Sequence, residues 1–299
     1  MKRVLAVTAV TATLAAGALP AAAITGGEPD GARHPNVALL MFYAEDGDTN
    51  ARFRCSGTLV SPTVVLTAAH CTEGTKGKTF VTFKSEIAQV APSGLPRAAD
   101  DAGDGTSDNG YLGTEGGGSA SDQFFAYGQS YTHDQYSGFT DLRNWNDVGV
   151  VKLMAPVPNV TPARIAPLNY LDRFAPPTLS KTSFTMVGYG TEVRKPDAGP
   201  QKPTPMSYPL IRRVTTSNGQ KLTSQVVQMN GNPANVLAGG GTCFGDSGGP
   251  SFLPDGKGGQ YLTTVTSYGL TENCRYIGGY QRVDIKVVQD WLAGFGVTP

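Results

Sequence analysis

The chain alternates short apolar runs of strand length with polar turns, and this pattern is the feature that most limits its fold. Residues 37–43 form a continuous apolar run, residues 53–60 alternate and include β-branched side chains, and residues 63–67 follow after a short break. Runs of this length bounded by turn residues predict antiparallel strands. The 38 glycines and 21 prolines are typical of many short strands joined by turns. The expected fold class is all-β.

The same pattern continues to the end of the chain. The expected further strands are residues 80–83 and 87–90 as a hairpin, then 124–127, 146–153, 183–190, 208–214, 225–229, 261–268 and 279–283. Only residues 285–292 read as a helix of the mature chain, with one apolar face that includes Val288 and Trp291. We expect Asp284 to cap this helix.

The first 23 residues have the features of a secretory signal peptide. Lys2 and Arg3 give a positive start, residues 4–19 are apolar, and three small alanines precede Ile24. A membrane anchor is the alternative, but the apolar stretch is short for a spanning helix. The 24 acidic and 24 basic residues balance, which gives no indication of nucleic acid or an anionic membrane as partner. We therefore expect a secreted, extracellular protein that begins at Ile24.

Four cysteines fit two disulfides in an oxidising compartment. Four cysteines allow three pairings, and sequence proximity favours Cys55 with Cys71 and Cys243 with Cys274. A zinc site is the competing interpretation, but the sequence has no CxxC pair. No metal and no cofactor is expected.

Two segments break the strand pattern. Residues 93–122 are rich in glycine, serine and aspartate and predict a long surface loop; the acids in it lack the ligand spacing of a known calcium loop. Residues 154–167 contain four prolines and predict a linker between domains at 24–153 and 168–299.

Three polar groups stand out because acyl transfer needs all of them. The run from Gly241 to Pro250 holds Ser247 between glycines, His70 follows a predicted strand, and Asp147 opens another. A serine hydroxyl becomes a useful nucleophile when a histidine removes its proton, and a buried aspartate holds that imidazole in the right tautomer. The sequence therefore predicts a serine nucleophile with its base.

These residues lie in motifs that resemble those of the chymotrypsin-like (trypsin-fold) serine peptidases. The matching segments are Thr67-Ala68-Ala69-His70-Cys71, Asn146-Asp147-Val148-Gly149-Val150-Val151-Lys152-Leu153, Gly245-Asp246-Ser247-Gly248-Gly249-Pro250 and the start Ile24-Thr25-Gly26-Gly27. The resemblance covers residues 24–299. It implies two six-stranded antiparallel β-barrels with a C-terminal α-helix, and an active site in the crevice between the barrels.

The resemblance also implies roles for individual residues. Ser247 would be the nucleophile, His70 the general base and acid, and Asp147 its orienter. The backbone N–H groups of Gly245 and Ser247 would form the oxyanion hole. Asp246 would pair with the new ammonium group of Ile24 after cleavage.

The primary substrate pocket is expected to be neutral and roomy. Gly241 matches the floor position of the family's pocket, and Gly269 and Gly278 match its walls, so no carboxylate meets a substrate cation. This favours Phe, Tyr, Leu or Met before the cut. Ser267, Tyr268 and Gly269 match the edge that pairs with the substrate backbone.

The expected function is therefore a secreted serine endopeptidase, a monomer that acts on polypeptides, with protein inhibitors as further candidate partners. Two alternatives stay open: a catalytically silent, peptidase-like binding protein, and a narrow-specificity processing protease or esterase on the same fold. The other histidines, His34 and His133, are weaker candidates for the base. Asp134 and Asp141 are weaker candidates for the orienter because they lie in turn-like contexts.

Overall fold

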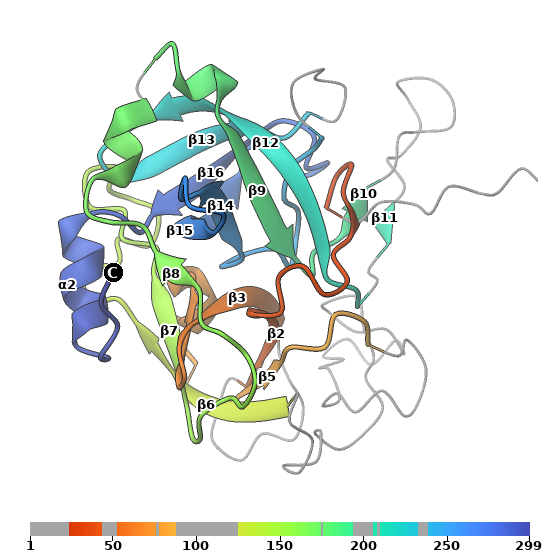
Figure 1. Ribbon diagram of the computed structural model, residues 1–299, viewed down its shortest axis with the longest axis vertical. Helices are drawn as coiled ribbons and strands as arrows, with labels where there is room; N and C mark the ends of the chain where they lie inside the picture. Colours follow the sequence, from red (N-terminus) through yellow and green to blue (C-terminus); the bar gives the residue numbers. More distant parts are fainter. Residues whose placement is uncertain are drawn as a thin grey trace, which may run out of the picture.

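Two β-barrels packed against each other make up the molecule (Figure 1). The computed structural model describes residues 24–43, 53–75, 78–87, 125–174, 176–193, 206–207, 210–232 and 239–299. The predicted signal peptide and the predicted loop at 93–122 lie outside the described residues. Within the described part of the chain, no helix is long and apolar enough to cross a bilayer.

The first barrel is closed by six antiparallel strands in the order β2-β3-β4-β7-β6-β5. These strands are β2 (Val37–Phe42), β3 (Phe53–Ser61), β4 (Val64–Thr67), β5 (Lys78–Thr82), β6 (Phe125–Thr132) and β7 (Gly149–Leu153). Strand β2 is buried on both faces: Val37 and Leu39 join a cluster that contains residues of both barrels, and Ala38 and Leu40 join a second cluster. Burial on both faces explains why its sequence is a continuous apolar run.

The second barrel closes through β9-β12-β13-β16-β15-β14 and back to β9. Its strands are β9 (Ser183–Gly188), β12 (Arg213–Leu222), β13 (Val226–Asn230), β14 (Pro250–Pro254), β15 (Gln260–Gly269) and β16 (Ile277–Arg282). Strand β1 (Glu28–Pro29) pairs with β12, and β8 (Arg164–Ile165) runs parallel to β15. The amino-terminal segment is thus part of the second barrel, although the first barrel follows it in sequence.

The remaining elements are short. They are α1 (Ala69–Thr72), η1 (Tyr170–Phe174), η2 (Leu179–Lys181), the two-stranded pair β10 (Glu192–Val193) and β11 (Met206–Ser207), and α2 (Lys286–Ala293). Helix α2 packs against the side of the barrels (Figure 1), with Val288 and Leu292 buried in the cluster that both barrels share. The predicted all-β class, the two barrels and the C-terminal helix are confirmed.

Three local predictions were wrong. Strand β5 has β2 and β6 as its neighbours, so neither of its edges is left for the hairpin partner expected at 87–90, of which residues 88–90 lie outside the described residues. The strand expected at 208–214 begins instead at Arg213 and runs through a polar stretch to Leu222. Asp284 does not cap helix α2: its carboxylate accepts hydrogen bonds from the Arg282 side chain and from the backbone N–H of Leu171.

Two disulfides are present, with the pairing that sequence proximity predicted. Cys55 is bonded to Cys71 and Cys243 to Cys274. The first links β3 to α1, the short helix that carries His70, and the second closes the loop before Ser247 onto the turn after β15. Both disulfides therefore border the predicted site. The linker predicted at 154–167 stays a prediction.

Candidate active site

His70 and Asp147 face each other in the first barrel. His70 lies in α1 directly after β4, and Asp147 lies just before β7, the strand that pairs with β4. His70 Nδ1 is 2.9 Å from Asp147 Oδ2, and the backbone N–H of His70 donates to Oδ1 at 2.9 Å. The Asp147 side chain is fully buried, whereas the His70 side chain is 21% exposed. The carboxylate thus fixes the ring while its other edge stays accessible.

The second barrel completes the surroundings of Asp147. Ser267 Oγ on β15 donates to Asp147 Oδ2 at 2.5 Å, and the backbone N–H of Asp147 donates to Gln281 Oε1 on β16 at 3.1 Å. Asn146 has a φ of 44°, in the left-handed region that asparagine tolerates better than most residues. This turn brings Asp147 to the interface of the barrels.

The loop that carries Ser247 is fixed tightly against the first barrel. Ser56 on β3 donates its backbone N–H to Ser247 O at 2.8 Å and its hydroxyl to Gly245 O at 2.9 Å. Gly248 has a φ of 74°, and a Cβ at this position would lie 2.0 Å from Thr67 Oγ1. Only glycine fits so close to β4 at this φ.

Within residues 245–249, two backbone N–H groups have no acceptor among the described residues. The N–H groups of Asp246, Gly248 and Gly249 donate to carbonyls at 2.8–3.0 Å. Those of Gly245 and Ser247 have no acceptor among the described residues. A pair of free N–H groups beside a nucleophile is the arrangement that binds an oxyanion.

A cavity of about 400 Å³ contains both His70 and Ser247 in its lining. Predicted substrate-binding residues Ser267, Tyr268, Gly269 and Gly278 line it as well. Gly241 is not in its lining; a Cβ on Gly241 would lie 2.5 Å from Gly231 Cα, and Gly231 does line the cavity. Further lining residues include Phe139, Thr242, Phe244, Leu270, Glu272 and Tyr280.

The described contacts include no hydrogen bond between the Ser247 hydroxyl and the His70 ring. In a site without substrate, catalytic hydrogen bonds are often long and tighten only in the complex. The shared cavity, rather than a formed bond, is what brings these two side chains together.

Asp246 is a fully buried carboxyl group. Burial raises the pKa of Asp246 to about 7, although the N–H groups of Cys243 and Gly190 and the charge of Arg54 lower it. Ile24 is also fully buried, and Thr25 pairs with Gly241 in an isolated antiparallel bridge. No hydrogen bond or ion pair joins Ile24 and Asp246 among the described residues. In the full-length chain the Ile24 nitrogen is a peptide nitrogen and carries no charge.

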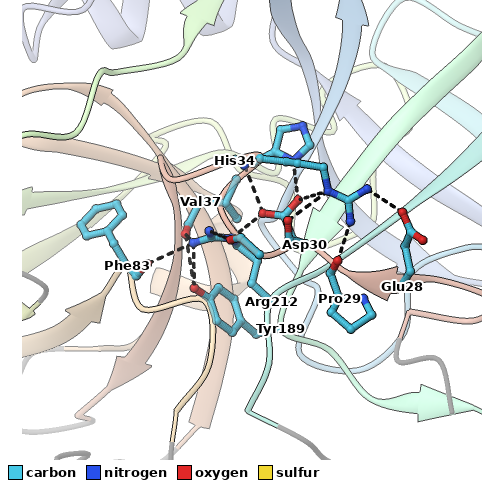
Figure 2. Close-up of polar contacts among 10 residues, drawn as sticks. Glu28, Pro29, Asp30, His34, Val37, Phe83, Tyr189 and Arg212 are labelled. Carbon is cyan, nitrogen blue, oxygen red and sulfur yellow. Dashed lines mark hydrogen bonds and ion pairs between the residues drawn. The ribbon is translucent and has the colours of Figure 1, made fainter. Parts of the chain in front are cut away.

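A buried ion pair anchors the segment that follows Ile24 (Figure 2). Arg212 Nε is 2.8 Å from Asp30 Oδ2, and both side chains are almost fully buried. His34 Nδ1 lies 2.5 Å from Asp30 Oδ1, and the Arg212 guanidinium also donates to Val37 O and Phe83 O of the first barrel. Burial alone would raise the pKa of Asp30, but the hydrogen bonds from His34 and Arg212 hold this pKa below its ordinary value.

None of the weaker candidates lines the cavity that His70 and Ser247 share. His34 is bonded to Asp30, and the buried His133 packs on Trp291 of helix α2 at 5.0 Å. Burial lowers the pKa of His133. Asp141 accepts hydrogen bonds from Arg143 N and Asn144 Nδ2 within its own turn.

One group of possible metal ligands occurs among the described residues, formed by Cys55, Cys71 and His70. The two cysteines are joined in a disulfide, so they supply no thiolate to a metal. His70 is therefore left without thiolate partners for a metal in this group.

Sequence reasoning missed two side chains that contact this site. The Trp145 indole donates to Ser267 Oγ at 2.9 Å, and Gln281 accepts from the Asp147 backbone. Trp145 stands two residues before Asp147 in an otherwise polar turn, which was an available signal. No sequence signal pointed to Gln281, because its role depends on which strand lies opposite Asp147.

Comparison with known proteins gives one family and many similar structures. The family model described as Trypsin matches residues 29–95 and 98–292. The structure named HL collagenase is 19% identical, with a TM-score of 0.57 over 93% of this chain and 97% of that one. Human heparin binding protein is 17% identical, with a TM-score of 0.58 over 92% of this chain and 98% of that one. At these identities, the structural likeness concerns the fold.

Proposed function

Because the chain belongs to the trypsin family, we propose that it is a serine endopeptidase that hydrolyses peptide bonds through an acyl-enzyme. The observation that carries this proposal is the pair of N–H groups at Gly245 and Ser247, which have no acceptor among the described residues, in the loop that places Ser247 in the lining of a cavity shared with His70. Peptide hydrolysis requires two such donors beside the serine hydroxyl to bind the oxyanion, whereas binding alone does not require them.

The proposed chemistry uses side chains and backbone N–H groups of this chain together with water. Ser247 Oγ attacks the scissile carbonyl carbon while His70 takes the hydroxyl proton, and the N–H groups of Gly245 and Ser247 bind the oxyanion. His70 then gives that proton to the leaving amine as the C–N bond breaks. Water, deprotonated by His70, attacks the acyl-enzyme, and its proton returns to Ser247 when the acid product leaves. Asp147 keeps the imidazole in the required tautomer throughout.

We propose a neutral primary pocket that accepts Phe, Tyr, Leu or Met. The hydroxyl groups of Thr242 and Tyr280, which line the cavity, lie 2.8 Å apart and are hydrogen-bonded to each other, so they demand no polar partner from a substrate. Among the described residues of the lining, Glu272 is the one acid, and it is exposed, so it attracts a cation only weakly. Gly241 as the pocket floor and Gly269 and Gly278 as its walls remain part of this proposal.

Activation is proposed to follow cleavage before Ile24, the step that a signal peptidase would perform in a secreted protein. Two features of the full-length chain support this. Asp246 is buried with a raised pKa, although the charge of Arg54 acts on it, and a new ammonium group at Ile24 would supply a further cation. Ile24 has a φ of 55°, which for a β-branched residue costs on the order of 1–3 kcal/mol. Cleavage before Ile24 would remove this constraint, because the φ torsion includes the carbonyl carbon of residue 23.

Polypeptides are the proposed substrates, and protein inhibitors that fit the same cleft are further candidate partners. A monomer is proposed. The two disulfides fit the proposed extracellular location.

The processed protein, purified with Ile24 as its first residue, is tested on a peptide panel that varies the residue before the cut. We expect cleavage after Phe, Tyr, Leu or Met and none by a Ser247→Ala variant. A strong preference for Arg or Lys would overturn the neutral pocket but leave the peptidase.

A silent binding protein is the rival from another class, and human heparin binding protein, with the same fold, carries a name that refers to binding. Absence of any hydrolysis by the correctly processed protein would favour it. Cleavage of small esters with no peptide cleaved, or of one polypeptide alone, would favour the esterase or the processing protease.

A further inference from the structure

A buried chain of hydrogen bonds leads from a tryptophan to the His70 ring. The Trp145 indole Nε1 donates to Ser267 Oγ at 2.9 Å, Ser267 Oγ donates to Asp147 Oδ2 at 2.5 Å, and His70 Nδ1 lies 2.9 Å from the same Oδ2. Trp145 is 6% exposed, Ser267 4% and Asp147 fully buried. Water therefore does not compete for these groups.

The direction of each hydrogen bond follows from the donors and acceptors. An indole N–H only donates, and a carboxylate oxygen only accepts. Ser267 has a single hydroxyl proton, so when its oxygen accepts from Trp145, that proton is directed at Asp147 Oδ2. The indole thus selects one orientation of the hydroxyl.

We propose that Trp145 is a positioning residue of this site, which orients the Ser267 proton onto Asp147 and so fixes the carboxylate that holds His70. This inference rests on the proposed peptidase function. Trp145 touches none of the reacting atoms and acts through Ser267 alone. Networks of buried hydrogen bonds strengthen each member, and removal of one donor leaves the next group unsatisfied.

The backbone around Trp145 keeps the indole in place. Asn146 turns the chain with its positive φ, and its Nδ2 donates to Gln135 O at 3.0 Å. The Trp145 carbonyl accepts from the backbone N–H and the hydroxyl of Ser137, both at 3.4 Å. A short turn thus delivers both Trp145 and Asp147 to Ser267, which comes from the other barrel.

The indole also packs behind the wall of the cavity. Its ring lies 5.2 Å from Phe139 and 5.3 Å from Tyr268, and both of these residues line the cavity. Phe139 in turn lies 5.5 Å from the His70 ring. A change at Trp145 could therefore alter packing as well as the hydrogen bond, and the test must separate the two.

A double-mutant cycle with Trp145→Phe and Ser267→Ala separates them. We expect Trp145→Phe to lower kcat about tenfold, with KM changed less than about twofold, because one buried hydrogen bond to the site is lost. In the Ser267→Ala background, Trp145→Phe should lower kcat by less than about twofold, because the hydroxyl that it orients is already gone.

The matched control is Trp291→Phe, which removes the other tryptophan of the chain, on helix α2 against His133 and Phe295. It should leave kcat and KM within about twofold of the parent. If Trp145→Phe fails to fold, a second variant replaces the indole by benzothienylalanine, which keeps the ring shape and lacks the N–H. The Trp291→Phe background is used because Trp145 is then the only tryptophan to be replaced. The same loss of kcat is expected.

The outcomes are distinct. A processed parent without hydrolytic activity overturns the proposed function, and the inference with it. An active parent whose Trp145→Phe or benzothienylalanine variant keeps its kcat overturns the inference alone. Equal effects of Trp145→Phe with and without Ser267 show a packing role and also overturn it.

Discussion

Gly248 makes one of the closest backbone contacts of the loop that carries Ser247. Its φ is 74°, and an added Cβ would lie 2.0 Å from Thr67 Oγ1 and 2.6 Å from Ser56 O. Gly256 has a similar φ of 77°, but no atom lies within 4 Å of its Cβ direction. An alanine at Gly256 would therefore add backbone strain alone, whereas an alanine at Gly248 would add the same strain and a steric clash with the first barrel.

We expect Gly248→Ala to lower the free energy of unfolding by several kcal/mol and Gly256→Ala by about 1 kcal/mol, the cost of the left-handed conformation alone. Urea unfolding of both variants in a Ser247→Ala background, which prevents self-digestion, measures the difference. Equal losses would mean that the loop moves away from β4 at little cost.

Asp147 and Asp141 are the two aspartates whose substitution tests which residue orients the His70 ring. Asp147→Asn replaces an acceptor of the His70 ring by an amide, which favours the wrong tautomer, and should lower kcat by about 10⁴, the size of the loss known for this change in the family. Asp141→Asn should leave kcat within about twofold, because Asp141 bonds only within its turn. Steady-state kinetics on one peptide decides, and the reverse pattern would displace Asp147.

At the scale of elements, the ion pair of Asp30 and Arg212 joins strand β1 and its flanking residues to both barrels. Asp30→Asn leaves the Arg212 charge buried without its carboxylate, so we expect a loss of about 3–5 kcal/mol in the free energy of unfolding. The exposed pair Lys286 and Asp290 is the control, and Lys286→Met should cost less than about 1 kcal/mol. A chemical-denaturation midpoint for Asp30→Asn equal to that of Lys286→Met would refute the anchoring role.

The elements also differ in how far the sequence predicts them. Strand β2 is apolar throughout because both its faces are buried, so its bounds were predicted within a residue. Strand β12 was placed too early because residues 215–222 are mostly polar. Their strand conformation depends on pairing with β9 at residues 215–218 and with β13 at residues 219–222. Asp284 has the residue type of a helix cap, but Arg282 and Leu171, brought near by the fold, bind it instead.

At the scale of the whole molecule, one buried cluster runs through both barrels and fixes their relative position. The site needs this arrangement, because Asp147 comes from the first barrel and Ser247 and Ser267 from the second. Motifs within single segments predicted the three candidate residues His70, Asp147 and Ser247. Contacts across the interface, such as Ser56 with the Ser247 loop and Trp145 with Ser267, could not be predicted because they depend on how the barrels pack.

The whole chain should also respond to cleavage before Ile24 in a pH-dependent way. In the uncut chain, the pKa of Asp246 is raised from 3.8 to about 7, so the folded state holds its proton more tightly than the unfolded state. This contribution to the free energy of unfolding is fully present below about pH 4 and is lost as the pH rises through 7. It amounts to at most about 4 kcal/mol. In the cut chain, the Ile24 ammonium favours the charged carboxylate and should remove most of this loss.

Two Ser247→Ala proteins test this predicted pH dependence: one begins at Ile24, and the other keeps residue 23 attached. Their free energies of unfolding, measured by urea between pH 4 and 7, should diverge as the pH rises, with the cut protein the more stable. Parallel curves would rule out the pairing of Ile24 with Asp246.

The central claim is that Ser247 is a nucleophile activated by His70. The most direct measurement is intact-mass analysis of the processed protein after treatment with a fluorophosphonate, with peptide mapping of the adduct. We predict one adduct per chain, located on Ser247, at least 100-fold slower to form in a His70→Ala variant and absent in Ser247→Ala. A processed, folded protein that gains no adduct on Ser247, or gains it at the same rate without His70, would contradict the account.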